Sequence, residues 1–209
     1  MPLFPPAPRR QLKHRRSLEI EVYAREDGLW EVEAHLIDTK TRVAPMVDGP
    51  RAAGVPIHHL QLRLVVDREL NVVQAGSKSH WTPYAGLCER HGPGPGEGHD
   101  AEAGDAYAAL AGLNLLKGFR RAVQERLGGV RGCTHLTELA QTLPTAVIQG
   151  MVGDVLDVRG TAPDAQRPFQ IDRCHALRSD GEAVRLHYPR WYRQPGAKQP
   201  AENPAAPAP

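Results

Sequence analysis

The stretch SLEIEVYAREDGLWEVEAHLID, residues 17–38, decides the fold, because it reads as two strands joined by a tight turn. Its first part alternates apolar and polar residues, which is the period of a strand that buries one face. Asp27-Gly28 in the middle suits the left-handed backbone of a hairpin turn. Beyond the turn, one face is apolar again: Trp30, Val32, Ala34 and Leu36. The stretch therefore predicts an antiparallel hairpin with one buried face.

A second hairpin follows the first. HLQLRLVVD (59–67) places an apolar residue at every second position, and ELNVVQA (69–75) returns after a short turn at Asp67-Arg68. We therefore expect the first half of the chain to form an antiparallel meander.

The second half of the chain changes to the helical period. Apolar residues recur every three or four positions over 116–127 and again over 136–147, with a pair of glycines between the two segments. Pro144 is expected to kink or interrupt the second helix. A last apolar alternation, in EAVRLHYPRWY (182–192), predicts a late strand at the edge of the sheet. The order indicates an α+β fold, an antiparallel meander sheet packed by two or three helices from the second half.

Composition sets the expected domain boundaries. Residues 1–16 are rich in proline and basic residues, and 194–209 form a proline and alanine tail, so both ends are expected to be disordered. The segment 90–105 has the glycine and proline content of a flexible insertion. Between the ends we expect a single α+β domain over 17–193.

Bulk composition excludes several classes of protein. With 209 residues, 41% hydrophobic and 24% charged, the chain resembles an ordinary globular protein. A net charge of +2 gives no argument for a nucleic-acid partner. The chain has no apolar run long enough to span a membrane and does not begin with a signal peptide, so we expect a cytoplasmic protein. Motifs of nucleotide-binding loops, serine hydrolases and zinc proteases are absent from the sequence.

GCTHLTEL (132–139) places a cysteine and a histidine two positions apart, where a glycine turn opens the second predicted helix. The positive end of the helix dipole favours a thiolate at Cys133, the form that binds metals or attacks electrophiles. His135 falls in the first turn, close enough to share a ligand or a proton with Cys133. A buried cysteine beside an ordinary surface histidine is the alternative interpretation.

The other two cysteines also lie at the boundaries of predicted elements. Cys88 follows the second hairpin, and Cys174 stands next to a histidine before the last predicted strand. Disulfides are not expected in a reducing compartment. A site for zinc or an iron–sulfur cluster would combine Cys88, Cys133, His135 and Cys174. Chance placement of three buried cysteines is the alternative.

Acid and base residues gather at the strand ends of the first half. Glu33 and His35 share a strand face two residues apart, which suits a general base and the residue that orients it. The solvent face of a one-sided sheet is the alternative for this pair. A catalytic interpretation combines them with the next strand and the helix start: Cys133, His135, Glu33, His35 and His58.

Four blocks of the sequence carry a resemblance to a known family: REDGLWEVEAHLIDTK, GVPIHHLQLRLVVD, GCTHLTEL and DRCHALRSDGEAVRLHYPRWY. In this order they resemble a bacterial family described as domain of unknown function number 2889, over roughly residues 15–193. That family supplies no activity. Relative to it, the 90–105 segment is longer and richer in glycine.

Two longer stretches are similar to iron–sulfur scaffold proteins of the NifU/IscU type: LVVDRELNVVQAGSKSHWTPYAGLC and LKGFRRAVQERLGGVRGCTHLTELA. The resemblance implies that Cys88 and Cys133 fall on two ligands of a cluster or of zinc. The first cysteine of the scaffold family has no counterpart in this sequence, so Cys174 or His135 would take its place.

These patterns lead to three hypotheses of function. The first is a cytoplasmic protein with a Cys/His site for zinc or iron–sulfur, in metal or sulfur handling or in support of a metal-dependent step. The second is a small catabolic enzyme that acts on an acyl or aromatic acid, with Cys133 as nucleophile or His135 as acid/base. The third is a binding module whose cysteines are core residues. A small-molecule acid or a partner protein is the expected partner.

Overall fold

A computed structural model describes residues 3–88, 105–156, 159–160 and 165–195. The chain forms two compact units, Met1–Gly150 and Met151–Pro209. The domain predicted over 17–193 includes both units, and its folding as one domain stays a prediction. The predicted insertion at 90–105, apart from its last residue, and the tail from residue 196 onward lie outside the described residues.

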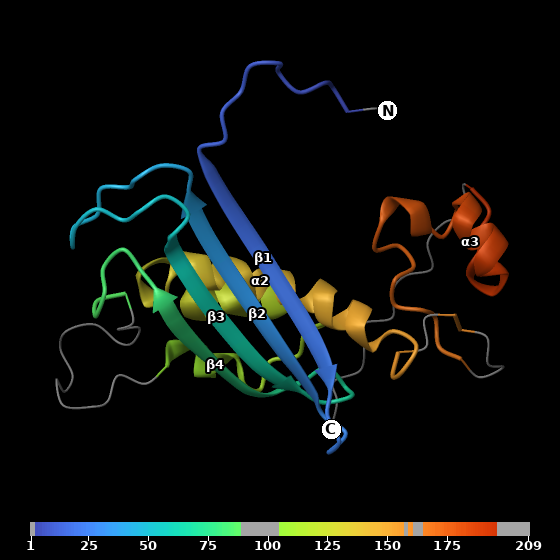
Figure 1. Ribbon diagram of the computed structural model, residues 1–209. Coiled ribbons are helices and arrows are strands. Elements are labelled where there is room, and N and C mark those ends of the chain that lie inside the picture. The colour runs from blue at the N-terminus through green and yellow to red at the C-terminus, as the bar shows by residue number, and fades with distance from the viewer. Residues whose placement is uncertain (1–2, 89–104, 157–158, 161–164, 196–209) are drawn as a thin grey trace. The chain divides into compact units, whose positions relative to one another are not determined.

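The first unit is built on a four-stranded antiparallel sheet (Figure 1). Its strands are β1 (His14–Ala24), β2 (Trp30–Lys40), β3 (Pro56–Val66) and β4 (Val72–Trp81). They follow one another in the order β1-β2-β3-β4, so each strand pairs with its neighbour in sequence. The predicted meander is therefore confirmed, and the two hairpins lie where the alternation of apolar residues placed them.

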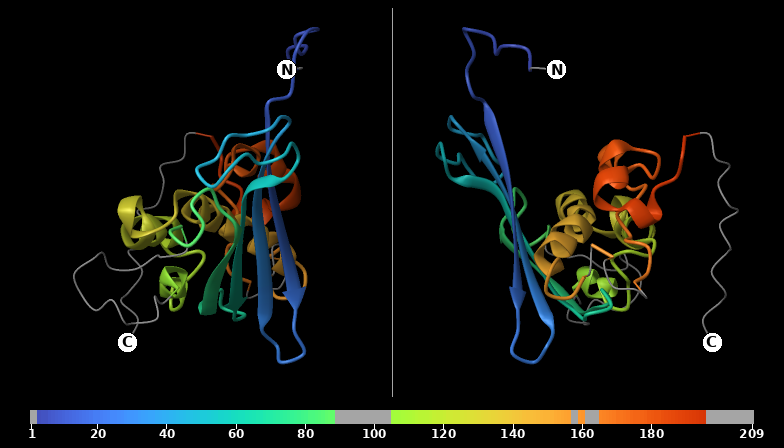
Figure 2. Two further views of the ribbon diagram at one scale, coloured as in Figure 1. Left: turned by 60° about the vertical axis from the view of Figure 1, so that its left-hand side comes forward. Right: turned by 90° about the vertical axis from the view of Figure 1, so that its right-hand side faces the viewer.

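Helices of the same unit cover one face of this sheet, as the edge-on view in Figure 2 shows. They are the short η1 (Ala106–Leu110) and η2 (Gly129–Arg131) and the longer α1 (Phe119–Leu127) and α2 (Thr134–Met151). α2 continues through Pro144 without a break. The predicted α+β fold, with helices from the second half, is confirmed.

The core lies between the sheet and these helices. From Trp30 to Asp38 the even-numbered residues of β2 are buried and the odd-numbered ones are half-exposed, which is the alternation expected of a one-sided sheet. The largest fully buried side chains of the unit are Leu36, Leu60, Leu62, Leu64, Leu70, Tyr107, Leu110, Phe119, Leu136, Leu139 and Leu143. Full burial of one such side chain stabilises the fold by about 1.5–3 kcal/mol. This core fixes α2 over the inner face of the sheet.

A glycine near the end of α2 brings helix and sheet into direct contact. A Cβ atom at Gly150 would lie 2.7 Å from the Cβ of Val22 in β1. Such a distance is shorter than any ordinary carbon–carbon contact. Gly150 therefore sets how close this end of α2 lies to the edge strand.

The second unit corrects one prediction. The segment expected to form a late edge strand instead forms a short helix, α3 (Glu182–His187), between η3 (His175–Leu177) and η4 (Pro189–Trp191). Glu182 and Arg185, one helical turn apart, form an ion pair that stabilises this helix. Of the alternating apolar residues, Val184 is buried whereas Leu186 is 56% exposed, so the alternation marks no buried strand face.

The start of β1 lies inside the segment 1–16 that was expected to be disordered. His14, Arg15 and Arg16 are part of the strand and pair with Lys40, Thr39 and Asp38 of β2, respectively. No helix in the described part of the chain is long and apolar enough to cross a membrane.

Candidate metal centre

A row of polar side chains crosses the sheet near one end. In the strand register, Arg16 of β1 pairs with Asp38 of β2, and Asp38 pairs with His58 of β3. Asp38 continues the series of inward-facing residues of β2 and is only 3% exposed. Because burial of an unpaired carboxylate costs several kcal/mol, such a group needs donors around it.

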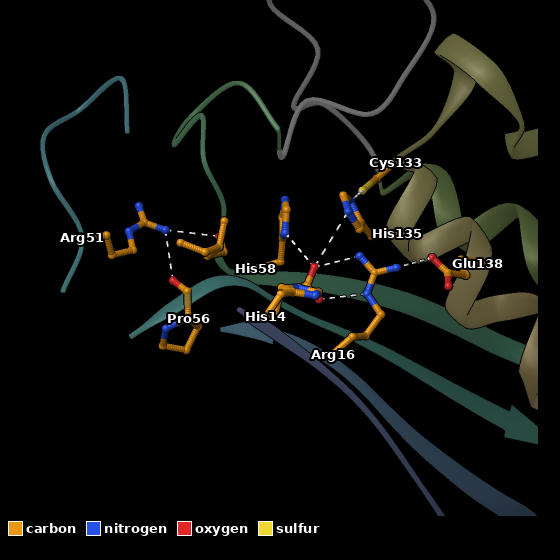
Figure 3. Close-up of polar contacts among 10 residues, drawn as sticks. His14, Arg16, Arg51, Pro56, His58, Cys133, His135 and Glu138 are labelled. Carbon is orange, nitrogen blue, oxygen red and sulfur yellow. Dashed lines mark hydrogen bonds and ion pairs between the residues drawn. The ribbon is translucent and has the colours of Figure 1, made fainter. Parts of the chain in front are cut away.

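Asp38 accepts four hydrogen bonds, drawn in Figure 3. Its Oδ1 accepts from Nε of Arg16 at 2.8 Å and from Nε2 of His14 at 3.0 Å. Its Oδ2 accepts from Nη2 of Arg16 at 2.8 Å and from Nδ1 of His58 at 3.0 Å. Burial alone would raise the pKa of Asp38, but the hydrogen bonds from Arg16 and His58 outweigh it and lower the pKa to about 2. Asp38 is therefore an oriented carboxylate at neutral pH.

The first turn of α2 brings a second histidine to this carboxylate. Nε2 of His135 lies 4.0 Å from Oδ2 of Asp38, and the rings of His135 and His58 lie 4.0 Å apart between centroids. The nearest ligand atoms of Asp38, His58 and His135 all lie within 4.8 Å of one another. We call this group the inner site.

Both histidines of the inner site favour the neutral form. Burial lowers the pKa of His58 below its ordinary value, against the opposite effect of Asp38. Burial and the neighbouring His58 lower the pKa of His135. At neutral pH the inner site therefore offers one carboxylate and two neutral imidazoles, the charge state in which these groups bind metals.

Cys133 lies directly beside His135, at the residue before α2 begins. Its Sγ is 3.8 Å from Nδ1 of His135, the ring nitrogen on the side away from Asp38. The carbonyl oxygen of Cys133 accepts a hydrogen bond from the buried Tyr107 hydroxyl at 2.8 Å. Burial raises the pKa of Tyr107 to about 12, so the hydroxyl keeps its proton as a donor. This contact holds the start of α2 in place.

An ion pair joins the same end of α2 to the edge strand. Nη1 of Arg16 donates to Glu138 at 2.6 Å, while the other nitrogens of the guanidinium hold Asp38 (Figure 3). Arg16 thus connects β1, β2 and α2, and it fixes the carboxylate relative to the helix that carries His135.

The inner site opens into a hollow of about 470 Å³. The two histidines of the site form part of its wall. The rest comes from β3, from the end of β4 and the loop after it, and from the turn that leads into α2: Leu60, Ser79, Thr82, Pro83, Tyr84, Leu87, Cys88, Val130, Gly132, Cys133 and Thr134. Tyr84, Leu87 and Val130 are exposed, so the hollow is open to solvent.

Arg51 holds the wall of the hollow together (Figure 3). Its guanidinium donates to the carbonyl of Pro56 at the start of β3 and to the carbonyl of Thr82 after β4, at 3.1 and 3.3 Å. It also lies over the ring of Trp81, 5.2 Å from the ring centroid. These contacts tie the strand that carries His58 to the loop that leads to Cys88.

The structure brings four of the predicted site residues together. Cys88, Cys133, His135 and His58 all line the hollow. Cys174 is exposed and belongs to the second unit. A metal site that combines all three cysteines with His135 stays a prediction.

Two other predicted residues lie on the opposite face of the sheet. Glu33 and His35 have odd numbers in β2, the half-exposed series, so they do not line the hollow with His58. Glu33 pairs with Arg63 of β3. His35 contacts His59, the sequence neighbour of His58 that points to the other face.

The predicted site residues leave out three residues of the inner site and its surroundings: His14, Arg16 and Asp38. Asp38 carried a usable signal, because it occupies the next inward position after Trp30, Val32, Ala34 and Leu36. A charged residue in a buried series is rare unless it is paired or binds a metal.

One family matches the chain. The model described as "Protein of unknown function (DUF2889)" matches residues 14–149. The chain belongs to this family. The match covers the sheet, α1 and α2 up to residue 149, including every residue of the inner site, and it ends before the second unit. No curated protein and no solved structure gives a significant match.

Proposed function

We propose that this protein binds one divalent metal ion at Asp38, His58 and His135. The observation that carries the proposal is the convergence of one carboxylate and two imidazoles within 4.8 Å, from β2, β3 and α2. Two histidines from separate elements meet at a buried carboxylate, which is the arrangement of a built site rather than of a solvated surface.

The donor set indicates which ions fit. Two histidines and one carboxylate are the protein ligands of catalytic zinc sites and of non-haem iron(II) centres, and both leave coordination positions open. Iron–sulfur clusters are held mainly by thiolates. Zinc or iron(II) therefore fits the inner site better than a cluster, for which Cys88 and Cys133 would have to supply the ligands.

The hydrogen bonds of Asp38 leave room for an ion. An ion bound to Oδ2 would take the place of the Nδ1 proton of His58, while Arg16 continues to hold both carboxylate oxygens. Outer partners of this kind orient a ligand and tune its charge. Arg16 and His14 are the residues in that role.

The hollow beside the inner site supports a role beyond storage of an ion. An open coordination position there would face a space of about 470 Å³, within the range of small-molecule sites. We propose that the ion serves metal handling or a metal-dependent step on a small acid, whose carboxylate would bind the ion directly.

Zinc titration of the full-length chain without a polyhistidine tag tests the metal centre. We expect Asp38→Asn and His135→Gln each to weaken binding at the inner site by at least about tenfold, because each removes a ligand. His187→Gln, which removes an exposed histidine of the second unit, is the matched control. Unchanged binding in both site variants would overturn the proposal.

One observation favours a second candidate function, the thiol chemistry of a small enzyme. Cys133, His135 and Asp38 lie in series, with distances of 3.8 Å from Sγ to Nδ1 and 4.0 Å from Nε2 to Oδ2. A nucleophile, a base and a carboxylate in this order form the arrangement of cysteine hydrolases, which would suit an acyl substrate.

Alkylation by iodoacetamide, quantified at each cysteine by mass spectrometry, tests this alternative. If His135 activates the thiol, Cys133 reacts faster than the exposed Cys174 at neutral pH, and His135→Gln removes the difference. If Cys133 reacts more slowly than Cys174 in the folded protein, covalent catalysis by Cys133 is excluded.

A further inference from the structure

The two edge strands of the sheet, β1 and β4 (Figure 1), differ in how the chain covers them. Along β4, the N–H of Val72 donates to the carbonyl of Leu113, and the carbonyl of Val72 accepts from the N–H of Gly112, both at 2.8 Å. Further along, the carboxylate of Asp105 accepts from the backbone N–H and the hydroxyl of Ser77. The chain itself therefore occupies polar groups of the β4 edge.

The edge formed by β1 has no such cover. β1 is 11 residues long and pairs with β2 over its whole length without a register shift. In the described part of the chain, its backbone forms hydrogen bonds with β2 alone. Proteins usually protect an exposed edge by proline, bulges, short strands or charge. β1 has no proline and no bulge, so charge is the device that remains.

The charges of β1 follow an order along the strand. Arg15 lies near its start, and Glu19 and Glu21 lie in its second half. Their positions pair with odd-numbered residues of β2, so all three side chains lie on the face of the sheet that carries no helix.

These charges are not balanced within one copy of the chain. Among the described residues, Arg15 and Glu19 form no ion pair, and Glu21 accepts a hydrogen bond only from the hydroxyl of Tyr23, at 2.7 Å. Across the strand pair, Glu21 lies opposite another carboxylate, that of Glu33. A strand with basic residues first and acidic residues later is complementary to its own antiparallel copy.

We propose that β1 pairs with β1 of a second copy of this chain, antiparallel, with Leu18 opposite Leu18. In this register residues 14–22 of the two copies lie side by side, and Arg15 of each copy lies opposite Glu21 of the other. The two-fold symmetry of such an interface makes this charge pair twice. Leu18, which is 44% exposed in one copy, is covered by its own counterpart.

The same pairing joins the two four-stranded sheets into one continuous sheet. Directly opposed residues of antiparallel strands point to the same face, so the α2 helices of both copies lie on one side of it. Arg16 keeps its inward direction and its hydrogen bonds to Asp38. The proposed dimer is therefore independent of metal binding at the inner site.

Sedimentation equilibrium of the full-length, untagged chain tests the interface. We expect a reversible dimer, and Arg15→Glu and Glu21→Arg should each weaken it by at least about tenfold, because each substitution sets like charges opposite one another twice. The double variant Arg15→Glu/Glu21→Arg exchanges the two charges and should restore the dimer. Arg68→Glu, an equal change of charge at an exposed turn between β3 and β4, is the matched control and should leave the dimer intact.

Three results would overturn the proposal. The first is a wild-type chain that stays monomeric at about 1 mM, since an association weaker than that does not assemble the protein in solution. The second is a dimer that neither single substitution weakens, which places the interface on another surface. The third is a double variant that stays monomeric although its circular dichroism and thermal unfolding match the wild type, because exchanged charges must then have no partner across the interface.

Discussion

Two adjacent histidines, His58 and His59, lie on opposite faces of the sheet and have different surroundings. His58 points inward, where it donates to a buried carboxylate, and its neighbour His59 points outward, where it contacts other imidazoles. The strand alternation alone separates them. The inner side chain is held by an ionised partner and a helix, and the outer one by the rings of His35 and His80.

This difference teaches how each group is stabilised. The inner site depends on Asp38 and on the guanidinium of Arg16, and removal of either leaves a charge without its partner. The histidines of the other face, His35, His59 and His80, contact one another without a carboxylate or a guanidinium, so loss of one ring leaves no ion pair broken. The inner face should therefore control folding, and the outer face should tolerate substitution.

Asp38→Ala should have the largest effect on stability. Loss of the carboxylate leaves Arg16 with only the exposed Glu138 as a partner, and because the Arg16 side chain is 30% exposed the cost should lie somewhat below the about 3–5 kcal/mol of a fully buried pair. The matched control is Glu138→Ala, which removes the 51% exposed partner of the same arginine and should cost less than ~1 kcal/mol. Urea unfolding measures both. Equal losses in the two variants would contradict the central role of Asp38.

Strong acid should lower the free energy of unfolding mainly through Asp38, on the inner face of the sheet. The pKa of Asp38 falls from 3.8 to about 2 on folding, so its contribution is complete above its ordinary pKa and is lost as pH falls toward 2. The loss amounts to about 2 kcal/mol at 1.36 kcal/mol per pKa unit. Urea unfolding between about pH 5 and pH 2 should show this slope in the wild type and a shallower one in Asp38→Asn.

Between about pH 7.5 and 5.5, protonation of the histidines on both faces of the sheet should lower the free energy of unfolding. Burial comes first among the causes that lower the pKa of His58, His135, His59 and His80. Unfolded histidines then bind more protons than folded ones, so stability is present above the ordinary value of 6.5 and falls as pH drops below it. Unfolding free energies at about pH 7.5 and 5.5 measure the loss, which should be smaller than that for Asp38. His135→Gln should flatten this dependence more than His80→Gln, because His80 is exposed.

Glu33→Gln should have the smallest effect. Glu33 pairs with Arg63 on the outer face, where the arginine side chain is 56% exposed, and such pairs contribute less than ~1 kcal/mol. Unfolding and zinc titration should both stay close to wild type. A large loss of zinc binding would contradict the assignment of the metal to the inner site.

The sheet could be predicted because its strands alternate apolar and polar residues with a period of two. Leu18, Ile20 and Val22 pair across the strands with Leu36, Ala34 and Val32, so the apolar residues of both strands share one face, although Leu18 in the edge strand is 44% exposed. The same rule failed in the second unit, where Val184 and Leu186 alternate in a short helix. An alternation over few residues does not distinguish a strand from a single helical turn.

The site was harder to predict than the fold. Cys133 and His135 were recognised from local spacing at a helix start, and the structure places them side by side. Their contact with Asp38 depends on how α2 packs over β2, which no local pattern contains. His14 and Arg16 lie outside the alternation of apolar residues, so their basic and proline-rich surroundings predicted a disordered tail. In the structure they belong to β1 and pair with residues of β2.

The close approach of Gly150 to Val22 means that a change at one end of α2 can alter the tilt of the whole helix. Gly150 and His135 lie near opposite ends of an 18-residue helix, separated by about 22 Å at ~1.5 Å per residue. A side chain at position 150 would push the far end of this rod from its support on β1 and tilt the end that carries His135. Ligand geometry at the inner site is thus set partly by an atom that is missing from the opposite end of the helix, and substitutions at Gly150 provide a way to adjust metal affinity without contact with the ion.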